Sequence, residues 1–369
     1  MLPPLRSLVL PFVIAALAGP LATTATADGG RCGDRGRPPC TVLRPPQLGP
    51  PTDTHHLAPE CIVAVGGFGS TSGDQAFDAL LGWTSDEPLY QVFHFGYRDD
   101  RFRYDTTGPI DVSGEDLRGF VASLAPDCRA IHIVAHSMGG AVADRAFSKG
   151  LSGRDRVATY LALSSPHNGA TLAQALRRPI ERDPLIAIEI GVLARTLGQP
   201  DPTTSAARDL ADLVVSRPRR EIRVPSARLR LATDAMVLRR DNIDRRSDVR
   251  EYFAVDALEG HGAILRNDQV RRVLQTTVAS HAVAVDNRSS LERGVADAVS
   301  RKLDANLSDA YAGLSWYLTN DPSAPLALAE AYGAVALSKA VWRVVEDVLA
   351  EIPDALVVLS PPGADLVLR

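Results

Sequence analysis

One serine of the sequence lies in a setting that suits nucleophilic chemistry. Ser137 follows an apolar run of strand length that ends at Ala135, and it precedes Gly139 and a helix-like run. A serine between a buried strand and a helix, with small residues two positions away on each side, is typical of a nucleophile elbow, whose tight turn exposes the hydroxyl. The helix start would also direct the N–H of Met138 towards a developing oxyanion. The pattern predicts a reactive serine at residue 137, although position 135 carries alanine where glycine is usual.

A serine hydroxyl also needs a base to take its proton and an acid to orient that base. The strand candidate 227–232 leads directly into Asp234, and the strand candidate 249–255 runs on to His261, which lies between two glycines. Both residues follow strand ends, so we expect them at the same sheet edge as Ser137. The chain order serine, acid, histidine predicts the triad Ser137, Asp234 and His261.

Four other acidic residues compete for the acid role. Asp241 and Asp244 lie further along a loop rich in charge, and we expect both to be solvated. Asp256 and Glu259 are closer to His261 in the chain, but one loop would then supply both acid and base. Asp234 is therefore the better candidate.

Two further histidines lie near the expected site. His167 also follows a strand end, but it precedes the acid in the chain, so we assign it to the substrate pocket. His136 adjoins the serine and cannot easily reach its neighbour's hydroxyl, so it too is assigned to the pocket.

A glycine-rich turn at residues 66–69 follows the first apolar run, and Gly67 in it is a third pocket candidate. Backbone N–H groups in such a turn can approach a substrate closely, because side chains are absent. The alternative, a nucleotide phosphate cradle, lacks support, since the chain has neither G-x-G-x-x-G before a helix nor GK[ST].

The elements that must position these residues alternate along the chain. Short apolar runs separated by helical stretches predict a mainly parallel α/β sheet of about six strands, covered by helices on both faces. The strand candidates are residues 61–66, 89–95, 130–135, 157–163, 227–232 and 249–255. The clearest helix candidates are residues 74–82, 114–124 and 139–149.

Two segments depart from this alternation. The connection at residues 171–225 is too long for an ordinary crossover and contains the apolar stretch 184–193. Such an insertion is either a functional lid or an extra pair of packing helices, and the sequence leaves both open. Residues 291–312 and 325–350 look helical, which predicts a helical C-terminal extension over residues 271–369.

The N-terminus is typical of an export signal. Arg6 precedes an apolar segment, and Ala25-Thr-Ala27 fits a cleavage site, so residues 1–27 are expected to be removed after Ala27 and the protein to be secreted. Residues 28–58 are rich in Pro and Gly and form a leader rather than a domain.

Four cysteines in an exported chain point to disulfides. Three pairings are possible in principle. Cys32 and Cys40 are close neighbours in the leader, whereas Cys61 and Cys128 each precede an apolar strand candidate. If those strands are adjacent and parallel, their starts lie within disulfide reach. We therefore predict the pairs Cys32–Cys40 and Cys61–Cys128.

Charge and composition exclude other classes. The formal net charge is −4 and no basic block stands out, so we expect no nucleic-acid partner. The histidines and cysteines show no metal-ligand spacing, so we expect neither a metal nor another cofactor.

Taken together, these motifs resemble the α/β-hydrolase superfamily, in particular its secreted bacterial (actinobacterial-like) lipase/esterase branch. The matching segments are residues 65–69, 135–140, 164–169, 233–237 and 260–262. The resemblance implies an α/β-hydrolase domain at residues 59–270 with a helical cap at about 171–225. It also implies oxyanion donors at Phe68 and Met138, although Gly66 stands where lipases often carry histidine. The sheet would begin at the superfamily's third strand, which makes the strands that follow Cys61 and Cys128 neighbours.

These features predict a secreted serine hydrolase that cleaves carboxylic esters, with lipid esters favoured by the resemblance and by the apolar insertion. A transient contact with a lipid surface would then follow. A short-chain carboxylesterase and an acyltransferase need the same triad, and an inactive secreted binding protein could keep the same fold. The oligomeric state is left open.

Overall fold

The computed structural model describes most of the chain between residues 58 and 320. The described residues are 58–70, 75–96, 102, 104–196, 201–216, 222–242, 249–252, 261–284, 288 and 290–320. The expected export signal, the Cys32–Cys40 pair, the helix candidate 325–350 and the acids Asp244, Asp256 and Glu259 lie outside these residues.

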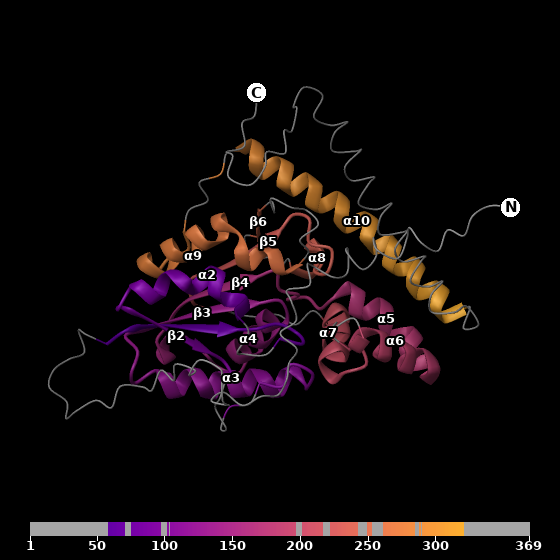
Figure 1. The fold of residues 1–369 in the computed structure, drawn as a ribbon, viewed down its shortest axis with the longest axis horizontal. Helices are drawn as coiled ribbons and strands as arrows, with labels where there is room; N and C mark the ends of the chain where they lie inside the picture. The colour runs from indigo at the N-terminus through magenta and orange to yellow at the C-terminus, as the bar shows by residue number, and fades with distance from the viewer. Residues whose placement is uncertain are drawn as a thin grey trace, which may run out of the picture.

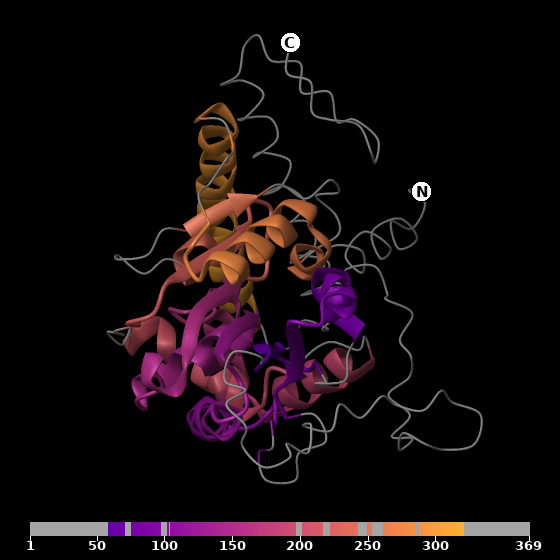
Figure 2. The same cartoon turned by 90° about the vertical axis from the view of Figure 1, so that its left-hand side faces the viewer.

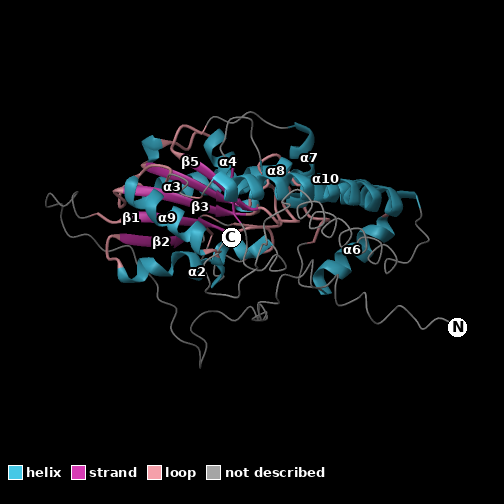
Figure 3. Cartoon of the chain, turned by 90° about the horizontal axis from the view of Figure 1, so that it is seen from above, coloured by secondary structure: helices cyan, strands magenta, loops and turns pink. Residues whose placement is uncertain are grey.

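Six parallel strands form a single sheet in the order β2-β1-β3-β4-β5-β6. The strands are β1 (Glu60–Val65), β2 (Tyr90–His94), β3 (Ala130–His136), β4 (Val157–Leu163), β5 (Ser226–Leu231) and β6 (Val249–Tyr252). Their side-by-side arrangement is visible from above in Figure 3. Each strand candidate from the sequence coincides with one of these strands, which confirms the predicted parallel sheet.

Each face of the sheet carries its own apolar core, because alternate strand residues point to opposite sides. Val63 and Ile133 pack with α3 (Ile110–Leu124) and α4 (Met138–Ser148) on one face. Ile62 and Val134 face the other side, which is covered by α2 (Asp78–Leu81), the 3₁₀ helix η5 (His261–Arg266) and α9 (Asp268–Ser280). Figures 1 and 2 show the sheet between these two helical layers. Short helices elsewhere are η2 (Gln75–Phe77), η3 (Gly82–Asp86), η4 (Gly153–Asp155) and α8 (Arg239–Asn242).

The described residues of the long insertion form three helices, which agrees with the predicted helical cap. These are α5 (Thr171–Arg182), α6 (Pro184–Thr196) and α7 (Ser205–Ser216), grouped beyond one end of the sheet in Figure 1. The carboxylate of Asp209 in α7 accepts a hydrogen bond from the Ile110 N–H at 2.8 Å. The Ala170 N–H donates to the Leu210 carbonyl at 3.0 Å. The cap is therefore fastened to the body of the protein at α7.

In the part of the C-terminal extension that the structure describes, there is one long helix, α10 (Ser290–Asn320), which runs diagonally in Figure 1. Its buried residues Leu303 and Leu307 pack against Leu238, in the segment after β5, and Leu172 of the cap. The expected domain boundary at residue 270 falls inside α9, whose Leu274 packs on the sheet. Helix α9 therefore belongs to the core rather than to the extension.

A disulfide joins Cys61 and Cys128, with their Cα atoms 5.7 Å apart, which confirms that predicted pair. The two cysteines lie at the starts of β1 and β3, which are neighbours in the sheet. Within the described part of the chain, no helix is long and apolar enough to cross a membrane.

Candidate active site

The turn between β3 and α4 has the geometry of a nucleophile elbow. Ser137 has φ 55° and ψ −133°, a region that residues other than glycine rarely occupy. Two backbone hydrogen bonds hold it there: Ser137 N–H donates to the Leu163 carbonyl at 2.9 Å, and Gly140 N–H donates to the Ser137 carbonyl at 3.0 Å. Helix α4 begins at Met138, so the N–H of Met138 has no acceptor within the helix.

Different neighbours explain why each of the positions around the elbow carries a small residue. A Cβ on Gly139 would lie 2.4 Å from the Val65 carbonyl oxygen, so only glycine lets α4 approach the end of β1 this closely. A Cβ on Gly67 would lie 2.6 Å from the Cβ of Ser137. Ala135, by contrast, belongs to β3 and packs in the core, where a methyl group fits without a clash. This explains why alanine is tolerated two positions before the serine.

Asp234 and His261 meet at the carboxyl end of the sheet. Asp234 follows β5, and its Oδ2 lies 2.8 Å from His261 Nδ1. Its Oδ1 accepts hydrogen bonds from the N–H groups of Met236 and Val237, both at 3.0 Å. Burial alone would raise the pKa of Asp234, but the charge and hydrogen bond of His261, together with Arg230, lower that pKa to about 2. The carboxylate is therefore ionised and can fix the imidazole.

The position of His261 leaves its second ring nitrogen available. His261 Nε2 is buried and makes no hydrogen bond with any residue that the structure describes. The His136 ring packs against the His261 ring with centroids 4.8 Å apart. Since His136 directly precedes Ser137, this contact places the His261 ring beside the elbow.

A family model described as a PGAP1-like alpha/beta domain matches residues 118–177, which include the elbow. No curated protein matches the sequence.

Several solved structures resemble the chain at low identity. Lipase BlEst2 of Bacillus licheniformis is 15% identical, with 61% of this chain and 93% of that chain covered and a TM-score of 0.43. Aspergillus fumigatus lipase B is 13% identical, with coverages of 76% and 63% and a TM-score of 0.42. Mouse alpha/beta hydrolase domain-containing protein 10 is 13% identical, with coverages of 60% and 88% and a TM-score of 0.41.

The chain's own topology decides the fold. A parallel sheet in the order β2-β1-β3-β4-β5-β6 carries a strained serine between β3 and the helix that follows it. An acid and a histidine follow later strands at the same edge. The chain has the α/β-hydrolase fold.

The two histidines that the sequence assigns to a pocket lie in different surroundings. Burial and the nearby charge of His261 lower the pKa of His136 to about 3, so the ring is neutral and packs against the expected base. His167 is buried, and its Nδ1 lies 2.6 Å from a carboxylate oxygen of Asp144 in α4. The Tyr160 hydroxyl donates to the same Asp144 at 3.2 Å. His167 thus supports the elbow helix, and its role in a pocket stays a prediction.

The expectation that Asp241 is solvated is wrong. Its side chain is 2% exposed, because the short helix α8 turns it towards the start of α5. It accepts hydrogen bonds from the Thr171 N–H at 3.1 Å and from the Thr171 hydroxyl at 2.6 Å. Burial raises the pKa of Asp241 to about 7. Asp241 joins the cap to the body of the protein and has no contact with His261 among the interactions of the described residues.

Arg230 is a site residue that the motifs did not identify. It is 1% exposed in β5, and its Nη2 donates to the carbonyls of Asp234 at 3.1 Å and Val237 at 3.0 Å. Its Nη1 contacts Glu251 of β6 at 3.1 Å and the Ser300 hydroxyl of α10. The guanidinium therefore clamps the loop that carries the acid. The sequence feature that could have indicated this role is a charged residue inside the otherwise mostly apolar strand candidate 227–232.

Proposed function

We propose that the protein is a serine hydrolase that cleaves carboxylic esters through an acyl-enzyme on Ser137. One observation carries the proposal: a paired Asp234 and His261 lie at the sheet edge where the strained Ser137 stands. Strain of this kind persists only where surrounding contacts impose it, and it is concentrated at functional sites.

In the proposed mechanism, His261 Nε2 takes the proton of the Ser137 hydroxyl as its oxygen attacks the ester carbonyl carbon. The tetrahedral intermediate collapses, and the alcohol leaves with the proton from His261. Water then attacks the acyl-enzyme, His261 accepts its proton, and the acid is released as Ser137 is restored. Asp234 keeps a proton on Nδ1 and stabilises the imidazolium that forms twice in the cycle.

Backbone N–H groups would stabilise the negative oxygen of each tetrahedral intermediate. The N–H of Met138 suits this role because it lies at the first position of α4, where the helix dipole also favours negative charge. Phe68 lies in the turn after β1, and its ring packs against the core, which fixes the turn. The near contact of Gly67 with Ser137 supports the proposal that this turn supplies the second donor.

A lipid ester is the proposed substrate class. Helix α6 of the cap exposes Leu185, Ile188 and Val192, which are 68%, 60% and 50% exposed. Their spacing places them on one side of the helix, where they could contact a lipid surface. The Cys61–Cys128 disulfide supports an oxidising, extracytoplasmic location, in agreement with the expected export signal.

Substitution of the serine tests the proposal. We expect Ser137→Ala to lower kcat on a nitrophenyl ester by at least about 10³-fold, since removing the nucleophile disables the whole triad. Ser148→Ala, in the exposed last turn of the same helix, is the matched control and should keep wild-type activity. A Ser137→Ala variant with near wild-type turnover would overturn the assignment.

Two further measurements separate the alternatives. A fluorophosphonate probe should label the wild-type protein at Ser137, and failure to label it would favour a binding protein. A series of acyl chain lengths, with an acceptor alcohol added, distinguishes lipase, short-chain esterase and acyltransferase by their products.

A further inference from the structure

A second group of reactive side chains lies at the opposite edge of the sheet. Glu60 is the first residue of β1, and His132 lies near the start of the neighbouring strand β3. His281 follows the last residue of α9. Ser137 comes five residues after His132 in the chain, which corresponds to about 16 Å of extended strand. The group is therefore separate from the candidate active site.

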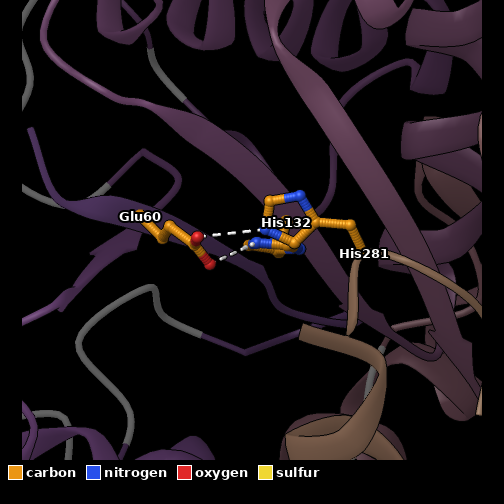
Figure 4. A group of neighbouring side chains, drawn as sticks. All are labelled: Glu60, His132 and His281. Carbon is orange, nitrogen blue, oxygen red and sulfur yellow. Dashed lines mark hydrogen bonds and ion pairs between the residues drawn. The ribbon is translucent and has the colours of Figure 1, made fainter. Parts of the chain in front are cut away.

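The three side chains converge on one point, as Figure 4 shows. Glu60 Oε2 lies 3.3 Å from His132 Nε2, and Glu60 Oε1 lies 3.0 Å from His281 Nε2. One nitrogen or oxygen atom from each residue lies within 4.8 Å of the others. Ligands of a tetrahedral zinc ion, bonded at about 2.0–2.2 Å, are separated by about 3.3 Å. The separation between Glu60 Oε2 and His132 Nε2 matches that spacing, and His281 Nε2 lies beside the other oxygen of the same carboxylate.

The outer contacts suit metal ligands. His132 is fully buried, and its Nδ1 lies 2.7 Å from the Thr159 hydroxyl, which fixes the ring and directs Nε2 to Glu60. Arg129 contacts Glu60 Oε1, so Oε2 remains for a cation. Burial would raise the pKa of Glu60, but the hydrogen bonds from Arg129 and His281 outweigh it and the pKa is lowered. Hydrogen bonds of this kind, from ligand to neighbour, are the usual second layer of a metal site.

The backbone at His281 adds an independent observation. This residue caps α9 in the left-handed region, with φ 53°, a position that glycine normally occupies. Histidine is less favourable than glycine at this helix end. This backbone conformation nevertheless directs the His281 ring at Glu60, more than two hundred residues earlier in the chain. Backbone strain of this type is a reason to look for function.

We propose that Glu60, His132 and His281 bind a zinc ion, which ties α9 to the starts of β1 and β3. Two imidazoles and one carboxylate form a donor set that favours zinc, because magnesium and calcium take oxygen ligands instead. The His281 side chain is 43% exposed, so a water molecule can complete the tetrahedron from the solvent side. The positive charge of Arg129 opposes the cation, but its side chain is 46% exposed and solvent screens it.

Zinc titration of the full-length protein, stripped with a chelator, tests the proposal. We expect calorimetry to show one zinc ion per chain and thermal unfolding to move to higher temperature with added zinc. His281→Asn should abolish this binding while it preserves the fold, because asparagine accepts the left-handed backbone. Thr159→Val should weaken the affinity by about 10–100-fold. His94→Gln, a histidine of β2 outside the group, is the control and should bind zinc normally.

Two results would overturn the proposal: no zinc binding by the wild-type chain at micromolar concentration, or unchanged binding by His281→Asn. Either result would mean that the group is a network of ion pairs only. The test is independent of ester hydrolysis, since Ser137→Ala should bind zinc as the wild type does.

Discussion

At the scale of single residues, the candidate site depends on how closely two backbones approach. Ser137 is held in a strained conformation by hydrogen bonds to neighbouring backbone. The turn after β1 can lie against it only because residue 67 has no side chain. If the turn supplies an oxyanion donor, as we propose, then Gly67 sets the distance between that donor and the nucleophile.

Gly67→Ala tests this relation. The new Cβ would lie 2.6 Å from the Ser137 Cβ, so either the turn or the serine must move. A displacement of about 1 Å can lower turnover by about 10²-fold, and the added methyl group should lower the free energy of unfolding by about 1–3 kcal/mol. Ester hydrolysis and urea denaturation measure the two effects. Gly153→Ala, where a Cβ meets nothing within 4 Å, is the control. Full activity of Gly67→Ala would show that the turn does not position the donor.

The sequence was informative about residues whose roles depend on local pattern. Ser137, Asp234 and His261 each follow a strand, and a parallel sheet brings strand ends to one edge, so the contact between Asp234 and His261 could be predicted. Asp241 could not be predicted in this way, because its burial depends on Thr171, seventy residues earlier.

At the scale of elements, helix α10 supports the loop that carries the acid. The Tyr311 hydroxyl donates to the Ala235 carbonyl at 2.6 Å, directly after Asp234. The Ser300 hydroxyl donates to Glu251 at 2.5 Å, and Glu251 in turn contacts Arg230. A helix outside the hydrolase motifs thus helps to determine where Asp234 lies. The sequence predicts a helix at residues 291–312, but its docking could not be predicted, since it depends on side-chain pairs between distant segments.

Tyr311→Phe isolates this support with a minimal change. Loss of one hydrogen bond should lower the free energy of unfolding by about 1 kcal/mol. If the helix positions Asp234, kcat should fall by about tenfold, the equivalent of roughly 1.4 kcal/mol in the barrier, with KM unchanged. Steady-state kinetics at a temperature well below unfolding separates the two effects. Trp316→Phe, which alters an exposed side chain of the same helix, is the control. If Tyr311→Phe lost the expected stability but kept its kcat, α10 would contribute to packing only and would not position Asp234.

At the scale of the whole molecule, different features gather at the two ends of the parallel strands, which we call the carboxyl edge and the amino edge of the sheet. The carboxyl edge bears the elbow, the acid and the histidine, with the cap beyond it. The amino edge bears the Cys61–Cys128 disulfide, and directly beside these cysteines stand Glu60 and Arg129. A covalent link thus holds the starts of β1 and β3 together where we propose the zinc ion. Strand β3 is thus held by the disulfide at its amino end, whereas the proposed nucleophile Ser137 follows its carboxyl end.

Replacement of both cysteines by alanine tests this division. The disulfide closes a loop between residues 67 positions apart, so its loss should lower the free energy of unfolding by about 2–5 kcal/mol, measured by urea denaturation. Turnover at low temperature should persist, because Ser137 and its partners lie at the other edge. Zinc affinity should fall, because Glu60 adjoins Cys61 and is no longer held beside His132. Lost turnover in a variant that is still folded would mean instead that the amino edge positions the elbow.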